Sequence, residues 1–295
     1  MDALPALVRR HTRFAPSPTG ELHLGHVAAM IHVWGWADLE NATVDVRIED
    51  HDRQRCRPEY TTRLLADLDW LGFTPLRGGR LRIQSHQTGR YDAALHQLQQ
   101  AGLVYACRCS RKSLPAAQSG GEVCYPGTCR EANWPAGPDT ALRVRLPDET
   151  VVFHDDQRGR QEQTPARQCG DFVIRDRHGQ YTYQFAVVVD DLLDHIDWVI
   201  RGEDLLASTG RQIILARLLG GTAPAFWRHH PLIVGSDGRK LSKSEGAPPL
   251  TELRERGLSA DDVIGQAAYR VGLQPTADPC PAARVSRLLS PRLSR

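Results

Sequence analysis

The segment at residues 13–26, with the sequence RFAPSPTGELHLGH, constrains the fold of this chain more than any other stretch. Residues 11–15 have the character of a short strand, which ends where Pro16 and Pro18 fix φ and force an extended turn. From Leu24 onward, apolar residues recur at helical spacing. The pattern therefore predicts a strand, a loop and a helix in direct succession, which is how α/β nucleotide-binding domains begin.

Two histidines, His23 and His26, stand at the start of the predicted helix. The free N–H groups and the dipole of a helix N-terminus favour phosphate, and imidazoles there can donate to the α-phosphate of ATP and to the leaving pyrophosphate. Gly25 leaves room for an adenine ring to lie on the backbone. We expect His23 and His26 to be catalytic, and His23, Gly25 and His26 to bind ATP. An ordinary helix that opens with two histidines is the alternative, which the preceding proline-rich run disfavours.

A second motif with two lysines comes after an apolar run at residues 231–235, which we interpret as a strand. After a turn signal at residues 236–238, Lys240 and Lys243 stand in a serine-rich segment. Two ammonium groups there can neutralise the charge that builds up on a triphosphate during adenylate formation. We expect both lysines to be catalytic and Lys243 also to bind ATP; a solvated basic loop is the alternative.

Together the two motifs resemble the class I aminoacyl-tRNA synthetases of the glutamyl/glutaminyl group. Residues 23–26 (HLGH) match the HIGH signature, and residues 240–244 (KLSKS) match the KMSKS signature. Residues 13–20 have the glutamate group's form of the segment that leads into HIGH, and residues 46–52 resemble its second strand. The resemblance implies a Rossmann-like, doubly wound parallel α/β sheet and an ATP-dependent ligase, with Mg²⁺ carried on the phosphates of ATP.

The organisation of the chain is inferred from breaks in its α/β pattern. We expect four parts: a first half of the catalytic domain (1–104), a zinc-containing insertion of acceptor type (105–170), a second catalytic half with the lysine loop (171–250), and a short helical extension and tail without an anticodon-binding domain (251–295). Within them we expect helices at 58–71, 87–101 and 253–271, and strands at 81–84, 142–146 and 150–153. The C-terminal tail contains four spaced arginines and is typical of a disordered, solubilising chain end (Arg284, Arg287, Arg292, Arg295).

The insertion holds a candidate metal site. Four cysteines, Cys107, Cys109, Cys124 and Cys129, stand close together in the sequence and suggest one structural, tetrahedral Zn²⁺. The resemblance implies a different fourth ligand, because small relatives of the glutamyl group have the pattern C-x-C and then Y-x₃-C. That pattern falls on Cys107, Cys109, Tyr125 and Cys129. Cys124 remains an alternative to Tyr125, and free thiols without metal are the alternative to the site as a whole.

A glutamate pocket needs a cation for the side-chain carboxylate and an anion for the α-ammonium group. Arg13 and Arg201 are the candidate cations, Glu49 is the candidate anion, and Tyr183 can add a hydroxyl donor. A structural Glu–Arg ion pair is the alternative for the charged residues, and a half-buried tyrosine is the alternative for Tyr183. The resemblance implies glutamate-binding residues at Arg13, Phe14, Ala15, Pro16, Ser17, Glu49, Tyr183 and Arg201.

The composition fits this interpretation and excludes others. The chain has 295 residues, 41% of them hydrophobic and 24% charged, with a net charge of +2 that does not demand a polyanionic partner. An RNA partner needs local patches, for which Arg53, Arg55 and Arg57 are candidates. No apolar run approaches membrane-spanning length, and residues 1–13 lack the core of a signal peptide. Seven cysteines, an odd number, favour a reducing cytoplasm. We expect a cytoplasmic monomer with no membrane partner.

The molecule that accepts the activated glutamate is inferred from the length of chain after the second motif. Residues 245–295 are too few for an independent anticodon-binding domain, so the chain resembles the truncated paralogues called glutamyl-Q tRNA(Asp) synthetases. The resemblance implies that L-glutamate is activated with ATP without tRNA and then esterified to queuosine in the anticodon of tRNA(Asp).

Three alternatives stay open at this point. A minimal glutamyl-tRNA synthetase would charge the 3′ end of tRNA(Glu). A nucleotidyltransferase with the same HxGH logic, such as a pantetheine-phosphate or nicotinamide-mononucleotide adenylyltransferase, would lack the cysteine insertion and the arginine pocket. A non-catalytic RNA-binding module would not need both ATP motifs.

Overall fold

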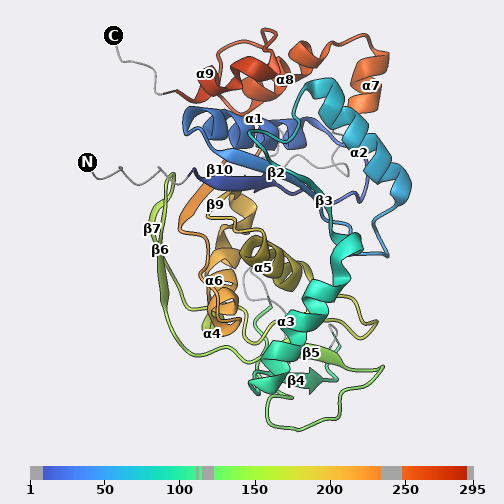
Figure 1. The fold of residues 1–295 in the computed structure, drawn as a ribbon, viewed down its shortest axis with the longest axis vertical. Coiled ribbons are helices and arrows are strands. Elements are labelled where there is room, and N and C mark those ends of the chain that lie inside the picture. The colour runs from blue at the N-terminus through green and yellow to red at the C-terminus, as the bar shows by residue number, and fades with distance from the viewer. Residues whose placement is uncertain (1–8, 111–112, 115–122, 234–247, 291–295) are drawn as a thin grey trace, which may run out of the picture.

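The computed structural model of the chain describes residues 9–110, 113–114, 123–233 and 248–290. The molecule is elongated, with C-terminal helices at one end, a small antiparallel sheet at the other and a parallel sheet between them (Figure 1). Within the described ranges, every helix is too short or too polar to traverse a bilayer.

The central sheet is built from two sets of parallel strands that meet side by side. Strands β1, β2 and β3 pair in that order, and β9 pairs with β10, which in turn pairs with β6 of the β6–β7 hairpin. Strand β1 adjoins the chain leading into β9, because the Asp197 N–H donates to the His11 carbonyl at 3.2 Å. The expected doubly wound arrangement is therefore confirmed. The strand bounds are β1 His11–Phe14, β2 Thr43–Ile48, β3 Leu81–Ile83, β6 Val151–Asp155, β7 Gly159–Gln163, β9 Trp198–Gly202 and β10 Phe226–His230.

Helices cover both faces of this sheet. Alternate side chains of β9 point to opposite faces, so Trp198 and Ile200 join a core with α1, α2 and α8, whereas Val199 joins a second core with α3, α5 and α6. The helices are α1 Leu24–Leu39, α2 Pro58–Leu71, α3 Thr88–Gln100, α4 Pro165–Gln168, α5 Tyr183–Leu193, α6 Thr209–Leu218, α7 Leu250–Glu255, α8 Ala260–Arg270 and α9 Val285–Leu289. Short 3-10 turns are η1 Gln84–Gln87, η4 Glu203–Ser208 and η6 Ala282–Arg284.

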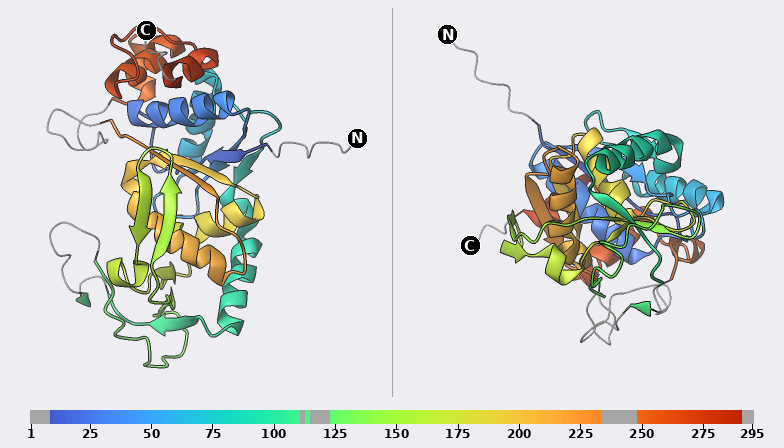
Figure 2. Two further views of the ribbon diagram at one scale, coloured as in Figure 1. Left: turned by 90° about the vertical axis from the view of Figure 1, so that its left-hand side faces the viewer. Right: turned by 90° about the horizontal axis from the view of Figure 1, so that it is seen from below.

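The region between the two halves of the sheet has two parts. A small antiparallel sheet of β4 (Val104–Cys107), β5 (Ala141–Val144) and β8 (Val173–Arg175) lies at the far end of the molecule (Figure 1). The β6–β7 hairpin instead runs along the body, where it extends the central sheet beyond β10 (Figure 2).

Two sequence predictions near the lysine segment were wrong. A strand was expected at 231–235, of which 234 and 235 lie outside the described residues; 231–233 form no strand, and the strand lies earlier, at β10, whose partner is β9. Pro231, the next residue, has no N–H to donate to a sheet. The single helix expected at 253–271 is broken into α7 and α8, because Gly257 takes a φ of +86° and Ser259 starts a new capping box with Asp262.

The expected disorder of the tail was also wrong over residues 282–289. These residues form η6 and α9, and Val285 and Leu289 are buried against α1. The approach is close enough that a Cβ on Gly35 of α1 would lie 2.6 Å from a methyl group of Leu289. Arg284 and Arg287 thus belong to ordered structure, whereas Arg292 and Arg295 lie outside the described residues.

Candidate functional site

A cavity of about 380 Å³ opens at the carboxyl ends of β1, β9 and β10, beside the N-terminus of α1. This is the edge at which doubly wound sheets bind nucleotides, and the volume suits a small-molecule ligand. The cavity brings together most of the predicted site residues: Arg13, Phe14, Ala15, Pro16, Ser17, His23, Gly25, His26, Tyr183 and Arg201.

The two histidines of the first motif form the N-terminal cap of α1. His23 accepts the Gly25 N–H at its Nδ1 (3.1 Å), and His26 accepts the His23 N–H at its Nδ1 (3.2 Å). A neutral imidazole that accepts at Nδ1 carries its proton on Nε2. The backbone therefore presets both rings as Nε2–H donors at a helix N-terminus, where a phosphate is favoured.

Arg201 is a buried cation with neutral partners. Its side chain donates to His229 Nε2 (2.9 Å), Gln212 Oε1 (2.7 Å), Thr209 Oγ1 (2.9 Å) and the Leu205 carbonyl (3.3 Å). Arg201 is 6% exposed, and the described part of the chain offers it no ion pair. Burial lowers the pKa of Arg201, yet a guanidinium stays protonated in proteins. Because a buried positive charge without a carboxylate partner is costly, Arg201 is suited to bind an anionic ligand.

The second candidate cation, Arg13, is already paired with the carboxylate of Asp191, to which Arg47 also donates. Its Nε and Nη2 atoms donate to both oxygens of Asp191 (3.0 and 3.2 Å), and Arg47 Nη1 donates to the same Oδ1 at 2.7 Å. Burial alone would raise the pKa of Asp191, but the two guanidinium groups hold it below its usual range. Asp191 and Arg47 were not singled out in the sequence, although Arg47 lies within the matched stretch at 46–52.

Glu49, the predicted anion, does not line the cavity. It is 2% exposed and accepts from Arg47 at 3.1 Å. Burial raises its pKa, an effect that Arg47 opposes. A carboxylate that the sequence did not single out, Asp204, does line the cavity on the turn after β9. Tyr183 is on the wall as expected, and burial raises its pKa, so its hydroxyl is neutral.

The lysines of the second motif, Lys240 and Lys243, lie outside the described residues. The described residues on both sides of them lie at the site: Ile233 lines the cavity, and Pro249 bridges to His23.

A separate cluster of sulfur atoms lies near the small antiparallel sheet. The thiols of Cys107, Cys109 and Cys129 lie within 4.8 Å of one another. The Tyr125 hydroxyl lies 3.5 Å from the Cys107 thiol and accepts the Cys129 N–H at 2.8 Å. Cys124 stands outside this group: its side chain is exposed, 4.0 Å from the Ala166 carbonyl. Three thiols and one oxygen are a donor set for tetrahedral Zn²⁺, so the residues present fit that metal.

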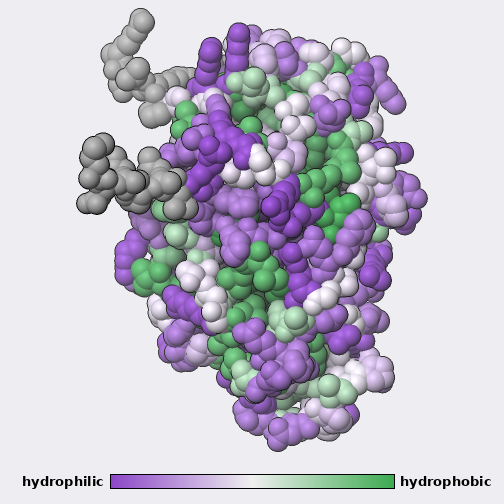
Figure 3. Space-filling view, viewed as in Figure 1, coloured by the Kyte–Doolittle hydropathy of each residue, from purple (hydrophilic) through white to green (hydrophobic). Residues whose placement is uncertain are grey.

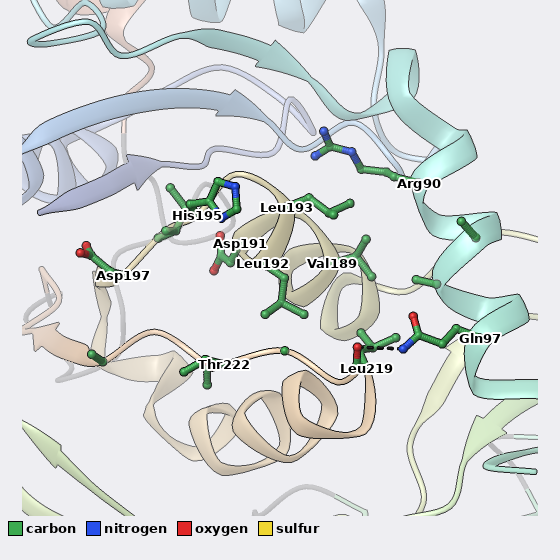
Figure 4. A pocket seen from close by; sticks show the side chains of 16 residues that line it. Arg90, Gln97, Val189, Asp191, Leu192, Leu193, His195, Asp197, Leu219 and Thr222 are labelled. Carbon is green, nitrogen blue, oxygen red and sulfur yellow. Dashed lines mark hydrogen bonds between the residues drawn. The ribbon is translucent and has the colours of Figure 1, made fainter. Parts of the chain in front are cut away.

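A larger cavity of about 680 Å³ lies between α3, α5 and the segment that links α6 to β10 (Figure 4). Apolar side chains gather on the molecular surface over these helices (Figure 3). Two polar residues of this cavity are already paired: Arg90 binds Asp190, and Gln97 donates to the Leu219 carbonyl at 2.9 Å. Its cation, Arg90, is paired with two carboxylates. The smaller cavity has a buried cation with neutral partners and two histidines at a helix N-terminus, and it is therefore the candidate site.

Comparisons with known proteins show the family of this chain. The family model for tRNA synthetases class I (E and Q), catalytic domain, matches residues 9–277. A protein of Symbiobacterium thermophilum named glutamyl-Q tRNA(Asp) synthetase is 41% identical, over 90% of this chain and 88% of its own length. One of the same name from Thiobacillus denitrificans is also 41% identical, over 92% and 88%. The glutamate–tRNA ligase of Frankia alni is 39% identical, over 84% of this chain and 53% of its own length.

Solved structures show the same fold. A glutamate tRNA ligase from Elizabethkingia meningosepticum superimposes with a TM-score of 0.74 at 24% identity, over 94% of this chain and 64% of that chain. Glutamate-tRNA synthetase from Elizabethkingia anophelis gives a TM-score of 0.72 at 25% identity, over 88% and 61%. The chain spans less than two thirds of the length of either.

Proposed function

Because the chain belongs to the class I tRNA synthetases of the E and Q group, a family of ligases, we propose that it activates L-glutamate with ATP and transfers the glutamyl group to queuosine in tRNA(Asp). The activation needs no tRNA. The observation that carries the choice of amino acid is Arg201, a buried cation on the cavity wall whose described partners are all neutral. The queuosine acceptor is supported by the names of the relatives that this chain matches over about nine tenths of its length.

The first step joins glutamate to AMP. A glutamate carboxylate oxygen attacks the α-phosphorus of ATP, and the bond to the bridging oxygen breaks so that pyrophosphate leaves. His23 and His26 donate from Nε2 to the α-phosphate and to the departing pyrophosphate, and Lys240 and Lys243 supply positive charge. Mg²⁺ bound to the phosphates adds charge neutralisation. In the second step a hydroxyl of queuosine attacks the carbonyl carbon of the mixed anhydride, and AMP leaves.

Glutamate is held by charge complementarity. Arg201 receives the side-chain carboxylate, with Arg13 and the Tyr183 hydroxyl beside it and residues 14–17 forming the adjoining wall. Glu49 is one candidate partner for the α-ammonium group; Asp204 is the other, since its side chain lines the cavity.

One Zn²⁺ is held by Cys107, Cys109, Tyr125 and Cys129, with a structural role. Metal binding would join β4 to the segment at residues 125–129, a link that the small antiparallel sheet does not provide. All seven cysteines are unpaired, which supports a cytoplasmic protein, and we propose that it acts as a monomer.

The proposal is tested by ATP–pyrophosphate exchange with glutamate in the absence of RNA, and then by transfer of labelled glutamate. Exchange should proceed, and label should enter tRNA(Asp) only from cells that make queuosine. The second candidate function is charging of the 3′ end of tRNA(Glu), which is favoured by the similarity to the glutamate–tRNA ligase of Frankia alni. Label that enters tRNA from cells with queuosine and from cells without it equally would decide for it.

A further inference from the structure

Three side chains on adjacent strands form a buried line behind the cavity. Asp155 ends β6, His229 lies on β10, and Arg201 lies on β9. The His229 Nδ1 lies 2.6 Å from Asp155 Oδ2, and the Arg201 Nε lies 2.9 Å from His229 Nε2. Asp155 and His229 have no exposed surface. Of the three, Arg201 is the one that lines the cavity.

The hydrogen bonds along this line have a fixed direction. Arg201 Nε is always a donor, so His229 must accept at Nε2 and carry its proton on Nδ1, from which it donates to Asp155. Asp155 Oδ2 also accepts the His229 backbone N–H at 3.1 Å, while its Oδ1 accepts the N–H groups of Gln157 (3.0 Å) and Arg158 (2.8 Å) in the hairpin turn. Burial lowers the pKa of His229, although the Asp155 hydrogen bond opposes the shift. The ring is thus neutral, and its tautomer is set by Asp155.

We propose that Asp155 and His229 are positioning residues for glutamate binding: Asp155 sets the tautomer of His229, and His229 Nε2 orients the guanidinium plane of Arg201 toward the glutamate carboxylate. The inference rests on the proposed function, because that function gives Arg201 its ligand. A planar guanidinium recognises a carboxylate only in a matching orientation, so a tilt of the plane weakens binding. Gln212 and Thr209 hold the two terminal nitrogens, and His229 is the partner that holds Nε.

The proposal gives the β6–β7 hairpin a part in substrate recognition. Asp155 reaches the site from a strand that precedes Arg201 by a long stretch of chain, yet β6 pairs with β10 at Asp155 and Trp227. The competing explanation is purely structural: Asp155 would only cap the hairpin turn through the N–H groups of Gln157 and Arg158. The two explanations differ in what they predict for the Michaelis constants.

The test uses glutamate-dependent ATP–pyrophosphate exchange by the full chain. In Asp155→Asn, an amide N–H facing His229 Nδ1 would move the ring proton to Nε2, where it confronts the Arg201 Nε–H. The KM for glutamate should rise roughly 10- to 100-fold, as for the loss of a hydrogen bond to a charged group, while the KM for ATP stays within about twofold. Asp171→Asn is the matched control, because Asp171 is also buried and accepts from Tyr105 and Arg130 away from the cavity. The control should lower thermal stability without changing the KM for glutamate.

A second pair of variants decides the question even if Asp155→Asn fails to fold. His229→Gln keeps an acceptor oxygen near the position of Nε2 and should raise the KM for glutamate only a few-fold. His229→Leu removes the acceptor and should raise it at least tenfold. In the His229→Gln background, Asp155→Asn should change the KM less than it does alone, since no tautomer remains to be set.

Each outcome has one meaning. A selective rise in the KM for glutamate in Asp155→Asn and His229→Leu supports the positioning role. An unchanged KM for glutamate, or equal rises for glutamate and ATP, overturns it and leaves Asp155 a turn cap. If the unmodified chain shows no glutamate-dependent exchange, the proposed function itself fails, which is a result distinct from either.

Discussion

His32 of α1 stacks on His230 at the end of β10, with ring centroids 4.5 Å apart and ring planes 2° apart. His32 is 3% exposed, and neither of its ring nitrogens has a hydrogen-bond partner among the described residues. Burial, and then the nearby charges of His230 and Arg228, hold the pKa of His32 well below its usual value. The folded protein therefore keeps this ring neutral.

This neutral ring makes stability depend on pH. The unfolded chain takes up a proton at His32 below about pH 6.5 while the folded protein does not, so stability falls as the pH drops below that value. At pH 5.5 the loss from this one group should be about 1 kcal/mol relative to pH 7.5. His32→Phe keeps the stacking and should remove the part of the dependence that comes from His32, leaving the part from the buried His229, as measured by urea unfolding at the two pH values. His96→Gln, a change at an exposed histidine, should leave the dependence as it is; an equally steep dependence in His32→Phe would contradict the assignment.

Replacing Arg201 should affect glutamate and not ATP. In Arg201→Gln the KM for glutamate in the exchange assay should rise roughly 100-fold or more, because a charge-assisted pair in a buried site is lost. The KM for ATP should change little. Arg217→Gln is a suitable control, since Arg217 on α6 is exposed and pairs with Glu149 away from the cavity. An unaltered KM for glutamate in Arg201→Gln would remove Arg201 from the binding site.

The cap geometry of α1 allows the two roles of His26 to be separated. His26→Asn retains an acceptor near Nδ1 for the His23 N–H but has no donor at the Nε2 position. His26→Gln has the reverse pattern, with a donor near Nε2 and no acceptor near Nδ1. We expect His26→Asn to lower kcat roughly 100- to 1000-fold with little loss of thermal stability. His26→Gln should lose stability and retain more activity, and the opposite ranking would show that the ring serves only as a cap.

The fourth metal ligand is decided by two substitutions in adjacent residues. The purified chain should contain about one zinc, and Tyr125→Phe should reduce zinc affinity because its hydroxyl lies beside the Cys107 thiol and accepts the Cys129 N–H. Cys124→Ser should leave the zinc content unchanged, since the Cys124 thiol is exposed and outside the cluster. Metal analysis after dialysis against a graded chelator gives the comparison. Zinc loss in Cys124→Ser with retention in Tyr125→Phe would establish a four-cysteine site instead.

The loop after β2 carries the three arginines that are candidates for an RNA contact. The Arg57 N–H donates to the Pro18 carbonyl at 3.4 Å, and the Arg53 and Arg57 side chains are exposed, whereas Arg55 pairs with Asp52 at 2.6 Å. Arg53→Ala and Arg57→Ala should weaken tRNA binding and each lower the salt dependence of affinity by about one unit. Exchange without tRNA should be unaffected in both. Arg55→Ala serves as the comparison, and if it weakens binding as much as the others, the contact is not made by Arg53 and Arg57 in particular.

Local signals in the sequence were sufficient for several elements. Helix α2 begins and ends where it was predicted, because Pro58 takes the first helical position and Gly72, with a φ of +79°, ends the helix. The turn into α1 was predictable for the same reason, since the prolines, Gly20 and the capping histidines all act within a few residues of one another. Family motifs added the site residues, most of which the fold does bring to one cavity.

The errors occurred where stability comes from distant partners. Strand β10 includes Arg228, His229 and His230 and looked less strand-like than the apolar run after it. Its two histidines are buried because each has a partner from another element: His229 pairs with Asp155, and His230 stacks on His32. The segment that forms α9 was predicted to be disordered because it contains several arginines. Its apolar residues nevertheless pack on α1, where Leu289 lies against Gly35.

The sequence by itself determined that this chain has a nucleotide-binding α/β fold, which class of ligases it belongs to, and which residues form most of its cavity. Only the tertiary structure decided that Cys124 stands apart from the other three thiols of the insertion, that Asp191 is shared by Arg13 and Arg47, and that Arg201 is held through His229 by Asp155. The last two hydrogen bonds join residues 28 and 74 positions apart. Periodicity and turn chemistry act over a few residues, so a contact across three strands leaves no pattern in the sequence from which it could be read.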